Sequence, residues 1–204
     1  REGLHYAMAR PDLYVVMALI FFASTFGLNF QIFNALMATK EFGKGPASYG
    51  LLGTYVAIGS LAGALISARL ERFRDSMLVV RLGVVFSLVV IATAFMPTYW
   101  TYSLWLPIGG VSALAMLISA NSYVQVNSDP AVRGRVMGIY LLIFMGGTPL
   151  GSLFIGYMTE AVGVRETIFI CGVIPLVAAT LLWVFFKDKL QKPDDLRVST
   201  ILKR

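Results

Sequence analysis

The chain has 204 residues, of which 57% are hydrophobic and only 14% are charged, and its formal net charge at pH 7 is +6. A water-soluble domain cannot easily bury so large an apolar fraction, so the composition favours a membrane protein over an ordinary soluble fold. The positive charge does not indicate nucleic-acid binding, because no soluble domain is predicted to present a basic face.

The distribution of the charges predicts six membrane spans. A helix needs about 20 mostly apolar residues to cross the hydrocarbon core, and one span fits each of the charge-free stretches 13–39, 45–68, 136–159 and 167–186. Stretch 82–128 is too long for one helix and is predicted to turn at Pro97, which lacks an N–H and is followed by interfacial aromatic residues. The predicted spans are Leu13–Thr39, Ser48–Ala68, Met77–Met96, Thr101–Val126, Val136–Tyr157 and Thr167–Phe186.

These spans predict an all-α fold, a polytopic membrane helical bundle of six transmembrane helices. They are apolar nearly all round, unlike soluble amphipathic helices, and they lack the alternation of barrel strands. An even number of spans places both termini on one side, and nearly all Lys and Arg residues lie on that side, with only Lys40, Lys44 and Arg165 opposite. The positive-inside rule therefore predicts cytoplasmic termini in a multi-pass protein of the plasma or inner cell membrane. Residues 1–12 are the predicted cytoplasmic segment before the first span, 13–186 form the six-span domain, and 187–204 are a cytoplasmic basic tail.

An internal repeat relates the second and fifth predicted spans. One constant offset pairs Gly50 with Gly138, Gly59 with Gly147, Gly63 with Gly151 and Leu65 with Leu153. The two spans run in opposite directions across the membrane, so the pairing predicts a three-plus-three inverted repeat, which is common in transporters.

The loop between the fourth and fifth spans reads Asp129-Pro130-Ala131-Val132-Arg133-Gly134-Arg135-Val136. Asp129 is predicted to cap the next helix, Pro130 to occupy its first position, and Arg133 and Arg135 to stay at the cytoplasmic surface. With its six spans, the chain resembles the C-terminal six-helix half of bacterial efflux members of the major facilitator superfamily. The corresponding loop of that family has a similar sequence: Pro, two variable positions and then Arg-Gly-Arg-Val. The resemblance implies that this sequence is a fragment whose partner is an N-terminal six-helix half.

Two further segments are similar to motifs of that family. Ser67-Ala68-Arg69-Leu70-Glu71-Arg72 looks like a degraded copy of its cytoplasmic loop motif, with Ser67 in place of Gly and Glu71 in place of Asp. In the family this loop latches one conformation through paired charges; here Glu71 and Arg72 form such a latch or only fix the orientation.

The second segment, Gly146-Gly147-Thr148-Pro149-Leu150-Gly151, is similar to a Gly-Pro-Gly feature of family antiporters. Pro149 is predicted to bend the fifth span. Small residues allow close helix packing. Gly147 and Gly151, like Gly59 and Gly63 in the second span, are therefore predicted packing or gating positions.

Uncharged polar side chains within the spans are the candidate substrate contacts, because hydrocarbon offers them no partner. Thr25, Asn29 and Phe33 have a four-residue spacing that predicts one shared helical face. The resemblance places their span on a central cavity. The full set of candidates is Thr25, Asn29, Phe33, Asn34, Ser112, Ser119, Asn121, Gln125, Tyr140 and Phe144. A mainly apolar wall of this kind suits amphipathic organic molecules, although interhelical hydrogen bonds explain each polar residue equally well.

These features predict a secondary active transporter that exports small hydrophobic or amphipathic, drug-like compounds by alternating access. The chain shows no pattern typical of an enzyme, no metal-ligand cluster, no cofactor motif and no Walker loop. No Asp or Glu lies deep in the spans, so a group that couples transport to the proton would belong to the N-terminal half. The predicted partners are the lipid bilayer, that half and a small-molecule substrate. The alternative is a stand-alone six-span homodimeric transporter or channel-like membrane protein.

Overall fold

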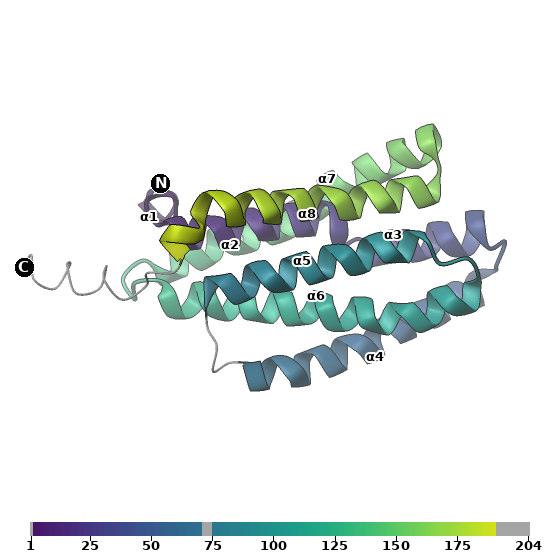
Figure 1. Cartoon of the computed structure of the whole chain (residues 1–204), viewed down its shortest axis with the longest axis horizontal. Coiled ribbons are helices and arrows are strands. Elements are labelled where there is room, and N and C mark those ends of the chain that lie inside the picture. Colours follow the sequence, from purple (N-terminus) through teal and green to yellow (C-terminus); the bar gives the residue numbers. More distant parts are fainter. Residues whose placement is uncertain (1, 71–74, 191–204) are drawn as a thin grey trace, which may run out of the picture.

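The computed structural model describes residues 2–70 and 75–190, which are almost entirely helical and contain no strand (Figure 1). A short helix precedes the first span, which is itself divided into two α-helical and two π-helical segments. The elements are α1 (Glu2–Ala9), α2 (Pro11–Phe22), η1 (Ala23–Gly27), α3 (Phe30–Leu36), η2 (Met37–Glu41), α4 (Pro46–Leu70), α5 (Ser76–Ala94), α6 (Tyr99–Asn127), α7 (Arg133–Val162) and α8 (Val164–Leu190).

Six helical stretches are long and apolar enough to cross a membrane, which confirms the six predicted spans. Their ends differ from the predicted ones by a few residues in most cases. The last helix continues to Leu190, beyond the predicted end at Phe186, and the rest of the predicted tail lies outside the described residues. Helix α1 occupies part of the segment that precedes the first span, where no helix was predicted.

Side-chain caps begin two of the spans but not the fifth. Asp75 accepts a hydrogen bond from the backbone N–H of Met77 at the start of α5, and Thr98 and Thr101 form a reciprocal capping box at the start of α6. The prediction that Asp129 caps the fifth span at Pro130 is wrong, because α7 begins at Arg133 after a turn. Asp129 instead accepts a hydrogen bond from the N–H of Ala131 within that turn, a local bond that competes with helix formation.

The three-plus-three repeat is visible in the order and packing of the helices. Pro11, Pro46 and Ser76 begin the first three spans, and Tyr99, Arg133 and Val164 begin the last three at a nearly constant offset. Helix α4 packs along α6, and α7 packs against the first span at η1. The second helix of each triplet therefore packs against the first helix of the other triplet. Helices α5 and α8, the third members of the two triplets, pack against each other and lie side by side in Figure 1.

Burial is uneven among the spans. Two thirds of the apolar window in the first span is buried (67%), whereas only 22% is buried in each of α4 and α7. Both of these helices expose large apolar side chains along their length. They include Leu51, Ile58, Leu61 and Leu65 in α4, and Leu142, Met145, Leu153 and Tyr157 in α7. Such faces require lipid or another polypeptide against them.

Candidate functional site

The first span is interrupted in its middle, at Leu28 and Asn29. The π-helical segment η1 ends at Gly27, and Leu28 and Asn29 leave the helical conformation before α3 begins. The side-chain amide of Asn29 donates hydrogen bonds to the backbone oxygens of Thr25 (2.8 Å) and Ser24 (3.4 Å). The Asn29 amide thus caps two carbonyl groups next to the interruption. Without it, these carbonyl groups would have no hydrogen-bond partner in hydrocarbon.

Two side-chain oxygens at this interruption are buried without a hydrogen-bond partner. They are Oγ1 of Thr25 and Oδ1 of Asn29, on residues that are only 4% and 3% exposed. An unsatisfied buried acceptor costs about 1–3 kcal/mol, so two of them in one place mark a site where a donor would be stabilising. Phe33, the third residue of the predicted face, is fully buried in the core.

Helix α7 packs directly against the interruption through two glycines. A Cβ atom on Gly147 would collide with the hydroxyl groups of Ser24 and Thr25, and one on Gly151 would collide with the carbonyl of Thr25. Both positions therefore require glycine for this close approach. Pro149 lies between them on the exposed side of α7.

A similar close contact of glycines with a neighbouring backbone, which we call a glycine seam, joins α4 to α6. A Cβ atom on Gly59 or Gly63 would collide with the backbone of Pro107 or Val111, and Gly110 of α6 lies equally close to the backbone of α4. The two seams occupy corresponding places in the repeat, and in both of them the paired segments run in the same direction.

The remaining cavity candidates lie on α3, α6 and α7 in differing surroundings. Asn34 is buried and accepts a hydrogen bond of 2.8 Å from the hydroxyl of Tyr102, a fully buried partner that sequence reasoning missed. Asn121 accepts one of 2.7 Å from Gln125, which is exposed. Ser112 bonds to its own helix, Ser119 and Phe144 are half-buried, and Tyr140 is buried. No hydrogen bond among the described residues joins these groups to Thr25 or Asn29.

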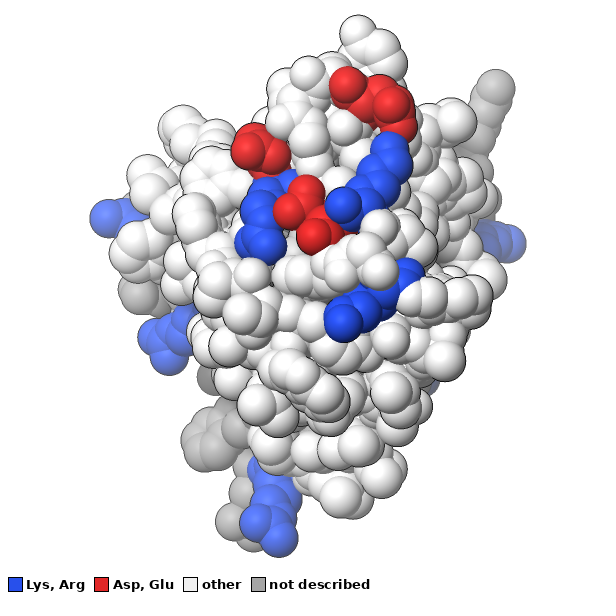
Figure 2. All heavy atoms as spheres, turned by 90° about the vertical axis from the view of Figure 1, so that its right-hand side faces the viewer, with Lys and Arg blue, Asp and Glu red and all other residues white. Residues whose placement is uncertain are grey.

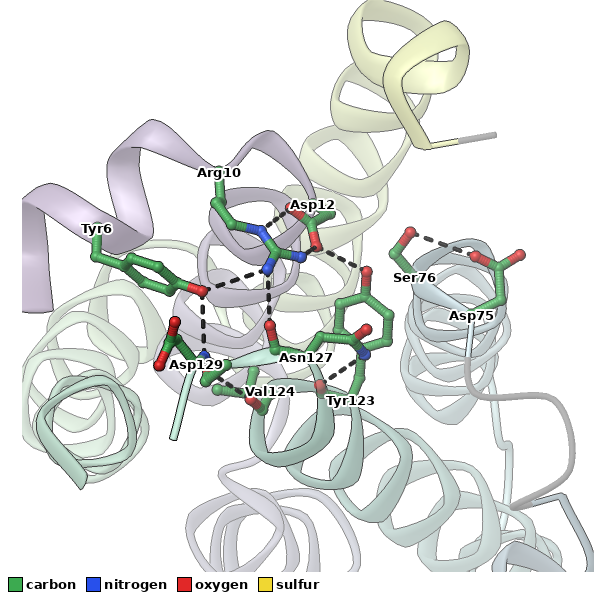
Figure 3. A network of polar contacts seen from close by, with 10 residues as sticks. Tyr6, Arg10, Asp12, Asp75, Ser76, Tyr123, Val124, Asn127 and Asp129 are labelled. Atoms are coloured by element: carbon green, nitrogen blue, oxygen red, sulfur yellow. Dashed lines mark hydrogen bonds and ion pairs between the residues drawn. The ribbon is translucent and has the colours of Figure 1, made fainter. Parts of the chain in front are cut away.

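A polar network lies at the end of the bundle that holds the N-terminus (Figure 3), and the sequence did not predict it. Arg10 donates to Asp12 through Nε (3.1 Å) and Nη2 (2.5 Å), and to the backbone oxygen of Asn127 (2.7 Å). Asp12 also accepts from the hydroxyl of Tyr123 (2.9 Å), and the hydroxyl of Tyr6 accepts from the N–H of Asp129 (3.1 Å). Burial disfavours the charged guanidinium, but hydrogen bonds and attraction from Asp12 outweigh it and raise the pKa of Arg10. The network ties α1 and α2 to the end of α6.

Charged residues also gather at the opposite end (Figure 2). Arg165 donates to Glu41 (2.9 Å) and to the backbone oxygens of Ala94 (2.9 Å) and Met96 (2.8 Å). Its guanidinium lies 5.7 Å from the ring centre of Phe42. Lys40 forms an ion pair of 2.5 Å with Glu160. Arg165 therefore joins the ends of the first, third and sixth spans at this surface.

Comparison with known proteins assigns the family. The family described as "Transmembrane secretion effector", an MFS family, matches residues 1–202. The chain belongs to the major facilitator superfamily. An uncharacterized MFS-type transporter of Enterobacter sp. (strain 638) is 24% identical over 107 residues, which cover 52% of this chain and 28% of that protein. The uncharacterized MFS-type transporter YcaD of Escherichia fergusonii is 23% identical over 138 residues, covering 65% and 36%. The chain thus spans about a third of the length of these relatives.

Membership of the major facilitator superfamily and the six membrane-spanning helices identify the chain as part of a multi-pass membrane protein. In the described part of the chain, no group of three or more His, Cys, Asp and Glu residues could hold a metal ion. Of the loop motifs, Arg133, Gly134 and Arg135 are exposed, and Arg133 donates to the backbone oxygen of Ser128 (3.3 Å). Glu71 and Arg72 lie outside the described residues.

Proposed function

We propose that the chain is the C-terminal half of a secondary active transporter that exports small hydrophobic or amphipathic compounds by alternating access. The family description names secretion, which supports an outward direction. The relatives are roughly three times as long as the segments aligned with this chain. That length leaves room for a further six-helix half.

The interrupted first span is the observation that carries the proposal. Transporters place their substrate sites where broken helices meet near the middle of the bilayer. Here the interruption at Asn29 lies about midway between Pro11 and Glu41, and it holds two buried acceptors without partners. A hydroxyl, amide or amine hydrogen of a substrate would satisfy these acceptors. The glycines of α7 would let the interruption open by a small displacement of one helix against the other.

The polarity of the spans supports an uncharged or amphipathic substrate. The polar side chains of Ser24, Thr25 and Asn29 at the interruption are neutral, and so is the buried Asn34–Tyr102 pair farther along the span. The ion pairs involving Arg10 and Arg165 lie at the two ends of the bundle. A strongly charged substrate would find no counter-ion among the described residues beside Thr25 and Asn29, so a mainly apolar molecule with a few hydrogen-bond donors fits best.

The exposed apolar faces of α4 and α7 support contact with the N-terminal half. In this arrangement both ends of the chain are cytoplasmic, in the cell membrane. The proton is then the proposed coupling ion, bound by a carboxylate of the other half, since the spans described here supply no deep carboxylate.

A dye-accumulation assay on the intact gene product tests the proposal. Cells that express the wild-type transporter are expected to hold several-fold less of at least one amphipathic dye than vector cells. Asn29→Ala should restore most of the accumulation at equal membrane abundance. Asn127→Ala is the matched control, because that side chain bonds to a nearby backbone oxygen at the end of α6, and it should retain export.

Two outcomes would contradict the proposal. One is unchanged accumulation of every dye when the intact protein is present in the membrane. The other is full export by the six-span chain alone, with crosslinks between copies along α4 and α7, which would support the homodimeric alternative.

A further inference from the structure

Helices α5 and α8 share an exposed face that is charged at one end and mostly apolar along the rest of its length. Along α5 and its C-cap residue, four exposed side chains recur at helical spacing: Arg81, Val85, Leu88 and Phe95. Helix α8 has four exposed side chains at comparable helical spacing: Phe169, Thr180, Trp183 and Lys187. We refer to these eight residues as the α5–α8 face. Residues with such spacing lie on one side of a helix.

Contacts at three levels show that the two stripes adjoin. The rings of Phe95 and Phe169 lie 5.7 Å apart at one end. Near the middle, a Cβ atom on Gly172 would collide with the backbone of Ile91. Towards the other end, Leu182 and Phe186 of α8 pack against a cluster that includes Met77 and Val80 of α5. The helices are therefore antiparallel neighbours along most of their length, and Arg81 lies near the level of Trp183.

The polar end of the face consists of two cations and an indole. Arg81 and Lys187 are exposed, and neither forms a hydrogen bond or ion pair with another residue that the structure describes. Trp183 lies one turn before Lys187 and is 44% exposed. Arg81 is just over one turn inside α5, so its guanidinium must extend toward the membrane boundary to stay hydrated. Beyond these residues the face is mostly apolar as far as the Phe95–Phe169 pair.

We propose that Arg81, Trp183 and Lys187 bind the phosphate of an anionic phospholipid whose acyl chain lies along Val85 and Leu88. Guanidinium and ammonium groups both bind phosphate well, and Trp prefers the headgroup level of a bilayer. Basic residues on neighbouring transmembrane helices are typical of such lipid sites. A free phosphate would use only the cations, whereas a lipid also covers the apolar stripe. With the proposed orientation, this lipid belongs to the cytoplasmic leaflet.

A lipid bound here would connect the two triplets of the repeat. Helix α5 belongs to the first triplet and α8 to the second, and one phosphate held by both Arg81 and Lys187 would stabilise their packing. The intact protein should therefore unfold at a higher temperature in detergent that contains phosphatidylglycerol than in detergent with phosphatidylcholine.

The test compares the intact protein with the double variant Arg81→Gln/Lys187→Gln. Native mass spectrometry measures the binding of phosphatidylglycerol and phosphatidylcholine in one detergent. Each cation near a membrane surface contributes roughly fivefold to the binding of anionic lipid, so the double variant should bind phosphatidylglycerol about 25-fold more weakly. Arg69→Gln, which removes an exposed cation from the last turn of α4, should bind like the wild type.

A second measurement separates a lipid site from general surface charge and from misfolding. Brominated phosphatidylglycerol should quench tryptophan fluorescence more than brominated phosphatidylcholine, and Trp183→Phe should abolish this difference. The double variant should melt like the wild type in phosphatidylcholine alone. The proposal is overturned if the double variant keeps wild-type phosphatidylglycerol binding, if Arg69→Gln loses as much, or if glycerol phosphate binds as tightly as the lipid.

Discussion

Gly151 of α7 lies directly against the backbone carbonyl of Thr25 in the interrupted first span. The same carbonyl oxygen accepts a hydrogen bond of 2.8 Å from the amide of Asn29. One peptide group is therefore in contact both with the side chain that caps the interruption and with the backbone of a neighbouring helix. Any side chain at position 151 must displace one of these contacts.

The first prediction follows from that contact. Gly151→Ala should destabilise the protein by about 1–3 kcal/mol, the usual cost of overpacking a tight interface. The measurement is unfolding in mixed micelles with increasing denaturing detergent. Gly146→Ala is the control on the same helix, because no atom lies within 4 Å of its new methyl group. Equal midpoints for the two variants would show that the seam is not as close as described.

The second prediction concerns the hydrogen bond between Tyr102 and Asn34. Tyr102→Phe removes the donor and leaves Oδ1 of Asn34 buried without this partner. Hydrogen bonds between membrane helices contribute about 0.6 kcal/mol on average and about 1.7 kcal/mol at most, so we expect a loss within that range in the same unfolding assay. Tyr157→Phe, at a residue that is 76% exposed, should change little. A loss of equal size there would point to a general effect of removing hydroxyls.

The third prediction concerns Arg165, which holds three spans together at the end opposite the termini. Arg165→Gln should destabilise the protein by about 1–3 kcal/mol, because charge-assisted bonds to two backbone oxygens and to Glu41 are lost together. Thermal unfolding in detergent measures the change. Lys44→Gln removes an exposed cation at the same end and serves as the control. Glu41→Gln should cost less than Arg165→Gln, since the two carbonyl contacts remain.

The fourth prediction concerns the orientation in the membrane. Cysteine substitutions at exposed Lys44 and Asp129 place thiols at opposite ends of the bundle, and the native Cys171 is buried. A membrane-impermeant maleimide should label Lys44→Cys in intact cells, and it should label Asp129→Cys only after the membrane is opened. The reverse pattern would place the termini on the outer side.

Much of the fold could be predicted because the charges mark the ends of the spans. Lys40 and Lys44 mark the loop between the first two spans, and Arg69 and Arg81 bracket the next loop at the opposite end of the bundle. The glycine pairs Gly59/Gly147 and Gly63/Gly151 correctly indicated the three-plus-three repeat, because close helix contacts select glycine in both halves. These signals arise because a charge inside the hydrocarbon core and a side chain at a close helix contact are both energetically unfavourable. A single sequence shows both effects in its choice of residues.

The interruption at Asn29 could not be predicted in the same way. The residues around it are compatible with a helix, apart from the weak signal of Gly27 and Asn29. The contacts beside the break, with α7 and with Phe86 near Gly27, join residues that are distant in the sequence. The network of Arg10 was missed for a related reason. Asp12 marked only the edge of a span, and its bond with Tyr123 joins residues that are distant in the sequence.

The two π-helical turns have a consequence for the directions in which side chains point. The first span contains 31 residues, and its counterpart α6 contains 29, although both extend from one end of the bundle to the other. A π-turn accommodates a surplus residue by widening the helix locally. Deleting one residue within Ala23–Gly27 would therefore remove the surplus and return this turn to α-helical geometry, with α2 and α3 keeping their directions. The π-turn thus lets the first span hold an extra residue while Phe33 and Asn34 keep facing the core.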